Sequence, residues 1–434
     1  MRTKKDILQL IEQEDVEFIR LQFTDVFGNL KNVAVTSSQL ERVLDNRYMF
    51  AGVAMFGNAN YENEDVYLRP DLDSFVILPW RPQQGKVARL LCDVCKADGC
   101  SHAMSPRTIL KKVIKAAESM GYTFYIDPDC EFFLFHTDEN GMPTTVTHDK
   151  AGLLDVGPMD LGENARRDMV LTLEEMGFEI ESSHHETAPA QHEIDFKEEE
   201  PLQIADSIIT FKSAVRSIAK RFGLHATFMP KPKNGVAGSG MHLSISVYKD
   251  GRCLFNTEPG STEVRDEAKW FMGGIMEHVE SMCAITNPLV NSYKRLMSGH
   301  KAPKDIVWSE KNVNPMLKVR RRLGEDTKVE LRFPDPSANP YLAIAVCLAA
   351  GMDGLERHLD PGTPAPACYK EEKPVKQLPG TLREAILALQ TSSFMEKVLG
   401  KEFVKFYADA KMEEWDSYME RVSTWEIESY LNRV

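Results

Sequence analysis

The spacing of apolar and polar residues near the start of the chain predicts a β-hairpin. Residues 17–35 read EFIRLQFTDVFGNLKNVAV, two alternating runs on either side of a turn at residues 27–29. Alternation of this kind predicts strands, and the Gly28-Asn29 pair favours a tight turn between them. Residues 71–80 and 87–94 are further strand-like runs. The first hundred residues therefore predict a small β-rich domain.

The pattern changes at Ser105-Pro106, where a second region begins. Ser just before a helix and Pro at its first position are strong start signals, and Gly121 is a typical end. Strands and helices follow without regular alternation, which favours an α+β fold over a doubly wound sheet. We expect two domains, at residues 1–103 and 104–434. The further strands are expected at 122–136 and 241–248, and the further helices at 164–176, 202–222 and 340–359.

Composition and charge narrow the class of protein. The chain has 434 residues, of which 43% are hydrophobic and 27% charged, an ordinary globular composition. No apolar run reaches the roughly 18 residues of a membrane span, and the first residues lack the apolar core of a signal peptide. The net charge of −13 is opposite in sign to the surface of a general nucleic-acid binder. We expect a cytoplasmic protein without membrane or nucleic-acid partners.

One group of cysteines has the spacing of a zinc site. Cys92, Cys95 and Cys100 precede His102, and together they offer four ligands. The alternative is that the run VARLLCDV is a buried strand in which Cys92 is a core residue. The sequence favours the buried strand and leaves zinc open.

Acidic residues on strand-like segments are the most informative chemical feature. Asp129 and Glu131 are two residues apart in an apolar run, so they share one face of a strand. A buried pair of charges is costly unless it is partnered or binds a metal ion. Further acids, imidazoles and hydroxyls recur at Glu186, Glu193, His242, Ser244, Ser246 and Glu330, with Arg332 beside the last. Oxygen-rich sites with an occasional imidazole suit Mg²⁺ or Mn²⁺, which suggests a phosphoryl substrate.

The order of motifs along the chain resembles bacterial type I glutamine synthetases. The motifs are EFFLF, SHHETAPAQHE, GLHATFMPKP, GSGMH, NSYKRL and VELRFPDPSANPYLA. With TDVFGNLKNV and YLRPDL near the start, the resemblance covers nearly the whole chain, and matches this long in this order are highly specific. It implies an N-terminal β-grasp domain, a larger catalytic domain and a double-ringed dodecamer with active sites between subunits. It also implies ATP, two or three Mg²⁺ or Mn²⁺ ions, and glutamate activated as γ-glutamyl phosphate for attack by ammonia.

The resemblance also implies roles for individual residues. One metal ion falls to Glu131, Glu186 and Glu193, and another to Asp129, His242 and Glu330. Nucleotide contacts fall to Glu181, Ser244 and Ser246, with Lys318 and Lys328 in place of family arginines. Glutamate contacts fall to Gly238, Arg295 and Arg332. Arg295 and Lys301 are the expected catalytic side chains.

The departures from the family cluster at the ammonia side and at the transferring phosphate. The aspartate that helps to hold and deprotonate ammonium is replaced by Ala51, and the flap glutamate that closes the ammonium site by Lys301. An arginine that contacts the phosphate is replaced by Val313. The run at 320–322, RRR, either substitutes for it or forms a solvated basic turn, and we favour the turn.

The loss of two acids and the gain of a lysine shift the local charge by +3, which disfavours an ammonium cation. An organic amine is therefore the better-supported acceptor, and the wider family contains γ-glutamyl-amine ligases. The apolar residues 53–56 either line a pocket for it or merely repack their loop. The alternative function is a catalytically impaired paralogue that binds ligands and regulates.

Overall fold

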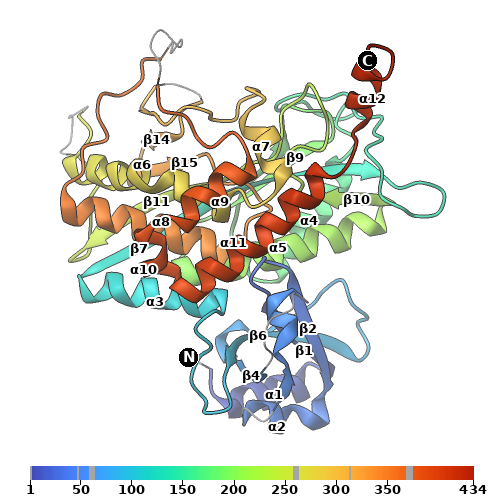
Figure 1. The fold of residues 1–434 in the computed structure, drawn as a ribbon. Coiled ribbons are helices and arrows are strands. Elements are labelled where there is room, and N and C mark those ends of the chain that lie inside the picture. The colour runs from blue at the N-terminus through green and yellow to red at the C-terminus, as the bar shows by residue number, and fades with distance from the viewer. Residues whose placement is uncertain (1, 46–47, 58–63, 258–262, 312–313, 368–374) are drawn as a thin grey trace.

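The computed structural model describes residues 2–45, 48–57, 64–257, 263–311, 314–367 and 375–434. They form two sheets of unequal size with helices packed around them, so the predicted α+β class is confirmed. Figure 1 shows the smaller sheet, in blue, below the larger part of the molecule. Among the described residues, no helix is both long and apolar enough to span a bilayer.

The predicted hairpin is confirmed and forms one side of the smaller sheet. β1 (Val16–Thr24) pairs antiparallel with β2 (Leu30–Thr36). Gly28 in the turn has a φ of +87°, and a Cβ there would lie 2.9 Å from the Cα of Asn339. Only glycine tolerates both conditions. β6 (Lys86–Cys95) runs parallel to β1. The other elements are α1 (Lys4–Gln13), α2 (Leu40–Leu44), β3 (Met49–Ala51), β4 (Asp65–Pro70), β5 (Val76–Ile77), η1 (Ser37–Gln39), η2 (Gly52–Phe56) and η3 (Leu72–Ser74).

The strand predicted over residues 71–80 is wrong for most of its length. Apart from β5, the segment folds as η3 and turns. The Asp71 carboxylate accepts a hydrogen bond from the Asp73 amide at 3.3 Å, and the Ser74 hydroxyl donates to the Asp71 carbonyl at 2.6 Å. Such local side-chain bonds compete with a strand ladder.

The larger sheet carries the acidic motifs at its centre. Its strand order is β13-β14-β15-β11-β7-β9-β8, with β10 beside β7 and β12 beside β11. The expected strands over 122–136 merge into one long strand, β7 (Tyr122–His136). The others are β8 (Ile180–His185), β9 (Gln191–Phe196), β10 (Leu224–Thr227), β11 (Met241–Lys249), β12 (Arg252–Cys253), β13 (Trp308–Ser309), β14 (Leu317–Arg320) and β15 (Lys328–Leu331).

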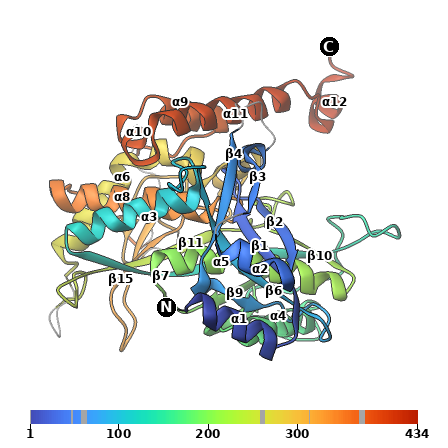
Figure 2. The ribbon, with the colours of Figure 1, turned by 90° about the horizontal axis from the view of Figure 1, so that it is seen from below.

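The helices predicted from the apolar pattern are confirmed. α3 (Pro106–Ser119) begins with proline and is followed by Gly121 at a φ of +82°. Ser105 occupies the N-cap position but makes no capping bond with its side chain. Figure 2 shows the C-terminal helices along one side of the molecule, ending in α12. The other helices are α4 (Glu163–Glu175), α5 (Pro201–Arg221), α6 (Asp266–Thr286), α7 (Val290–Leu296), α8 (Pro340–Arg357), α9 (Leu382–Gln390), α10 (Ser393–Leu399), α11 (Lys401–Met419) and α12 (Thr424–Tyr430).

The cysteines do not gather into a zinc site. Cys92 and Cys95 lie on β6 and are buried, and the Cys92 thiol donates to the Leu90 carbonyl at 3.6 Å. The His102 Nδ1 accepts a bond from the Met104 amide at 3.2 Å. Burial raises the pKa of Cys92, which opposes the thiolate that zinc requires. Within the described ranges, the groups of side chains that converge as metal ligands include none of the four residues, so the buried-strand interpretation is the one supported.

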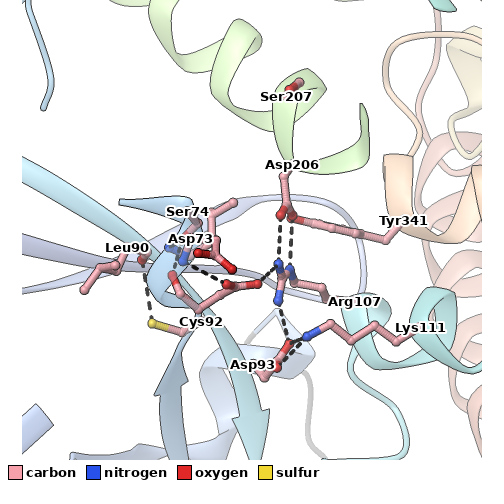
Figure 3. A network of polar contacts seen from close by, with 12 residues as sticks. Asp73, Ser74, Leu90, Cys92, Asp93, Arg107, Lys111, Asp206, Ser207 and Tyr341 are labelled. Carbon is pink, nitrogen blue, oxygen red and sulfur yellow. Dashed lines mark hydrogen bonds and ion pairs between the residues drawn. The ribbon is translucent and has the colours of Figure 1, made fainter. Parts of the chain in front are cut away.

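A buried arginine joins the smaller sheet to the helices of the larger part. Arg107 at the start of α3 contacts Asp93 of β6 at 2.8 Å, Asp71 at 2.6 Å and Asp206 of α5 at 2.8 Å. The Tyr341 hydroxyl of α8 donates to Asp206 at 2.6 Å. Figure 3 shows the Arg107 guanidinium between the carboxylates of Asp206 and Asp93. The arrangement fixes the small sheet against the helices that support the large one.

Replacement of Arg107 by alanine is expected to lower the free energy of unfolding by about 3 kcal/mol, because it leaves buried carboxylates without their cation. Denaturant titration followed by circular dichroism measures the loss. The exposed Arg167 on α4 is the matched control, and its alanine variant is expected to change stability by less than about 0.5 kcal/mol. Equal stability of the two variants would contradict this role of Arg107.

Candidate active site

Strand register brings the acidic side chains together on one face of the larger sheet. Asp129 of β7 lies opposite His242 of β11 on one side and opposite Asp195 of β9 on the other. Glu131, two residues further along β7, lies opposite Glu193. Directly opposed residues on neighbouring strands have adjacent side chains, so the sheet itself assembles the cluster.

One of the two predicted metal-binding sets comes together in the structure. Oxygen or nitrogen atoms of Asp129, His242 and Glu330 all lie within 4.8 Å of one another. The His242 Nδ1 lies 3.8 Å from the Asp129 carboxylate and 3.6 Å from that of Glu330. Two carboxylates and one imidazole on three adjacent strands form a donor set that suits a divalent cation.

A second converging set on this face of the sheet differs from the predicted one. His184, Glu193 and Asp195 bring one ligand atom each within the same limit of 4.8 Å. Glu131 is held apart by hydrogen bonds from the Gln191 side chain, at 2.7 Å, and from the Gly240 amide, at 2.9 Å. Sequence reasoning missed Asp195, although its position two residues after Glu193 on a strand was the signal that could have identified it.

A cavity of about 680 Å³ opens over this face. We call it the carboxylate cavity. Eleven residues that the sequence singled out line it, namely Asp129, Glu131, Glu186, Glu193, Gly238, His242, Arg295, Lys301, Lys318, Glu330 and Arg332.

The remaining predicted nucleotide contacts lie elsewhere. Ser244 and Ser246 are buried within β11. Glu181 and Lys328 line a neighbouring cavity of about 1010 Å³. Glu181 pairs with Arg322, which lines the carboxylate cavity, so one ion pair lies between the two cavities.

The carboxylates repel one another in a buried setting. Burial raises the pKa of Asp129, and burial together with the charge of Glu186 raises the pKa of Glu131 to about 7. Burial and the charge of Asp195 raise the pKa of Glu193 well above its usual value. Glu186 differs, because bonds from His184 and Thr187 outweigh its burial and lower its pKa to about 2. A divalent cation would offset this excess of negative charge, so these residues fit the metal ions that the motifs imply.

The run RRR at 320–322 follows the prediction only in part, because Arg321 and Arg322 are exposed beside a turn while Arg320 is not. The Arg320 side chain is only 15% exposed, and its Nη1 donates to the Ser244 hydroxyl at 2.7 Å. The same atom lies 3.5 Å from the Asp129 carboxylate. Arg320 ends β14, two strands from β11, and its long side chain crosses β15 to the cavity. Arg320 therefore brings a positive charge to the carboxylate cavity. Val313, where the loss of a phosphate-contacting arginine was expected, lies outside the described residues.

The two glutamate-contact arginines have different freedom to bind. Arg295 is 3% exposed and donates to the carbonyls of Phe333 at 2.9 Å and Arg332 at 3.0 Å. Arg332 pairs with Glu330. Arg332 lines the carboxylate cavity, and its Nε is a buried donor without a partner among the described residues.

Lys301 is held at the cavity in an unusual conformation. Its φ is +60°, and its Nζ donates to the hydroxyl of Thr187. Its charge helps to lower the pKa of the adjacent Glu186. The lysine thus neutralises part of one wall of the cavity.

The departures at residues 51–56 lie away from the carboxylate cavity of this chain. Ala51 is exposed at the end of β3, opposite Asp65. Met55 and Phe56 are 0% and 2% exposed in the chain's own core, which supports loop repacking for these two residues. Val53 and Ala54 are half-buried.

Comparison with known proteins supports the family that the sequence motifs resemble. The model of the glutamine synthetase β-grasp domain matches residues 15–97, and that of the glutamine synthetase catalytic domain matches residues 103–430. A glutamine synthetase from Clostridium saccharobutylicum is 51% identical and covers 99% of both chains. One from Staphylococcus aureus (strain N315) is 47% identical over 99% of this chain and 98% of its own.

Solved structures agree over the same length. A GmaS complex with ADP superposes with a TM-score of 0.89 at 30% identity, covering 98% of this chain and 99% of its own. GmaS without ligand gives a TM-score of 0.88 at 29% identity. The smaller sheet is therefore a β-grasp domain and the larger part a catalytic domain. Matched over nearly its whole length, the chain belongs to the glutamine synthetase family of ATP-dependent ligases.

Proposed function

We propose that this ligase activates the γ-carboxylate of glutamate with ATP and transfers it to an organic amine in preference to ammonium. The observation that carries the choice of acceptor is Lys301. Its ammonium group lies at the carboxylate cavity beside Glu186, where the family motif has a glutamate that closes the ammonium site. A unit charge at 4 Å is worth about 4 kcal/mol at an effective dielectric of about 20. Solvent reduces this interaction energy, but the positive charge of Lys301 still repels a small cation such as ammonium.

The carboxylates are proposed to hold the metal ions. Asp129, His242 and Glu330 would bind one ion, and Glu131, Glu186 and Glu193 another, with His184 and Asp195 beside them. Mg²⁺ or Mn²⁺, when bound, supplies positive charge for the phosphate oxygens of ATP. The raised pKa values of Asp129, Glu131 and Glu193 support this assignment, since burial raises all three and neighbouring carboxylates further raise those of Glu131 and Glu193.

The arginines and Gly238 are proposed to hold glutamate. A guanidinium matches the planar carboxylate with two parallel hydrogen bonds. Arg332 lines the carboxylate cavity, which supports a role in binding the α-carboxylate. Arg295 is clamped by main-chain carbonyls, which supports a fixed position for the remaining face of its guanidinium. A Cβ at Gly238 would lie 2.1 Å from the Pro230 carbonyl oxygen, so only glycine fits this wall.

ATP is proposed to lie along Glu181, Ser244, Ser246, Lys318 and Lys328. The superposition with an ADP-bound GmaS supports a nucleotide in this part of the fold. Lys328 is paired with Glu198 at 2.7 Å and with Asp127 at 3.3 Å, and Glu181 with Arg322. When ATP binds, Lys328 and Glu181 must leave these ion pairs to contact the phosphates or the base. Arg320 is a further candidate for a phosphate contact, since it reaches Ser244 and Asp129.

A homo-oligomer, in the form of a dodecamer, completes the proposal. Ala51 is exposed and lies outside the carboxylate cavity of its own chain, which fits a site shared between neighbouring subunits. We place the protein in the cytoplasm, with no nucleic-acid or membrane partner.

A regulatory paralogue is the second candidate, and the same lysine favours it. A cation beside Glu186 reduces the negative charge available to a metal ion. Phosphate release from Mg-ATP and glutamate, across ammonium, small amines and polyamines, separates the two functions. Amine-dependent release is the expected result. No release with any acceptor, while ADP or glutamate still binds, would reject the ligase proposal in favour of the regulator.

A further inference from the structure

A second group of buried polar side chains lies behind the cavity, on the opposite face of β8 and β9. It consists of Asp149, Asp160, His185 and His192, with Arg166 of α4, and every member is at most 7% exposed. His185 and His192 lie opposite each other in the strand register. Their sequence neighbours point the other way, into the cavity, because side chains alternate along a strand. The group is therefore separated from the carboxylates only by the thickness of the sheet.

The hydrogen-bond partners of His185 assign a proton to each of its ring nitrogens. Its Nε2 lies 3.1 Å from the Asp149 carboxylate, and its Nδ1 lies 2.6 Å from the Glu186 carbonyl and 3.0 Å from that of Gly152. All three partners only accept, so both ring nitrogens must carry a proton.

The other half of the group is also balanced in charge. Arg166 Nη1 lies 2.7 Å from the Asp160 carboxylate and 2.8 Å from His192 Nδ1. A guanidinium only donates, so His192 Nδ1 accepts and the ring is neutral. Each of the two aspartates therefore already has a cation. Although four ligand atoms of the group lie within 4.8 Å, no further positive charge is needed, and this argues for a positioning network rather than a metal site.

Asp149 connects this network to the turn that carries the cavity residues. Its carboxylate accepts bonds from the amides of Ala151 at 2.9 Å, Leu161 at 3.1 Å and Ala190 at 3.2 Å. Ala190 has a φ of +67°, a conformation that costs a non-glycine residue energy and persists only when its surroundings hold it. The next residue, Gln191, donates to Glu131 at 2.7 Å. The Asp149 carboxylate thus bonds to His185 at the end of β8 and to Ala190 just before β9, and so holds both ends of the turn between these strands.

We propose that Asp149 is a positioning residue that fixes Glu186, Gln191 and Glu193 from behind, through His185 and the amide of Ala190. The proposal rests on the metal-binding role given above to Glu131, Glu186 and Glu193. Side chains that orient metal ligands through one hydrogen bond typically account for 10- to 100-fold in metal affinity. Asp149 does not bond to a metal-ligand side chain itself, but acts through the backbone of the turn and the ring of His185.

Titration of the full chain with Mn²⁺, followed by electron paramagnetic resonance, tests this role without any acceptor. Asp149→Asn keeps the shape of the side chain but removes the charge opposite His185. Mn²⁺ is expected to bind this variant about 10-fold more weakly or worse. Asp138→Asn is the matched control, because Asp138 accepts bonds from the amides of Asn140 and Met142 in an exposed turn. Its Mn²⁺ affinity is expected to stay within about twofold of the parent.

Arg166→Lys keeps the charge but removes the guanidinium Nη1 that contacts both Asp160 and His192. It provides a second test if Asp149→Asn does not fold. A severalfold loss of Mn²⁺ affinity with an unchanged unfolding midpoint is expected. Parent-like affinity of both folded variants would overturn the positioning role alone. Absence of Mn²⁺ binding by the parent chain would instead refute the metal assignment, and this proposal with it.

Discussion

Replacement of Glu131 by alanine is expected to abolish metal-dependent nucleotide binding. Glu131 lines the carboxylate cavity opposite Glu193, and burial together with the charge of nearby Glu186 raises its pKa. The substitution removes one ligand and also the acceptor for Gln191 and the Gly240 amide. Both changes disturb the binding of the same metal ion. We therefore expect the affinity for Mg-ADP to fall at least 10³-fold, which corresponds to about 4 kcal/mol or more. Isothermal titration calorimetry with ADP, with and without Mg²⁺, measures it.

Glu139 supplies the control for this variant. It lies just beyond the end of β7 and is exposed, so Glu139→Ala removes an equal charge without reaching the cavity. Its affinity for Mg-ADP is expected to match that of the parent. If Glu131→Ala also binds Mg-ADP like the parent, Glu131 is not a metal ligand and the assignment of the first ion is wrong.

The double variant Ala51→Asp with Lys301→Glu is expected to move the acceptor preference toward ammonium. It changes the local charge by −3, restoring the acids of the family motif. Solvent is taken to reduce the interaction energy of each unit charge from about 4 to about 1.4 kcal/mol. The three charges together then change the ratio of the kcat/KM values for ammonium and amine by about 10³-fold. Lys301→Glu also removes the bond to Thr187 and restores a carboxylate beside Glu186. Phosphate release with each acceptor gives the ratio.

The matched control is Lys311→Glu. Lys311 is exposed and does not line the carboxylate cavity, yet the substitution makes the same change in total charge as Lys301→Glu. The acceptor ratio of this control is expected to stay within about twofold of the parent. An unchanged ratio in the double variant would mean that Lys301 does not select the acceptor. The single variant Lys301→Glu measures the effect of Lys301 alone on the acceptor ratio. It separates this effect from that of Ala51, which we propose to contribute to the site of a neighbouring subunit.

Local patterns predicted most of the elements that carry the site. The alternation in residues 17–35 predicted β1 and β2, and the Ser-Pro start and Gly121 predicted α3. The spacing of Asp129 and Glu131 predicted a shared strand face, which β7 provides. These predictions succeeded because strand alternation, helix ends and turns depend on residues close together in the sequence. Residues 71–80 failed for the same reason, since local bonds of Asp71 and Ser74 replaced the strand that their apolar content suggested.

The order of motifs determined the family, the two-part architecture and most of the residues that line the carboxylate cavity. Only the tertiary structure decided how those residues are partnered. It placed Asp195 and His184 beside Glu193, drew Arg320 out of the solvent, and packed Met55 and Phe56 into the core. It also revealed Asp149 behind the hairpin. Each of these outcomes depends on strand register or on packing between distant segments, and no local pattern encodes which distant partner a buried charge will find.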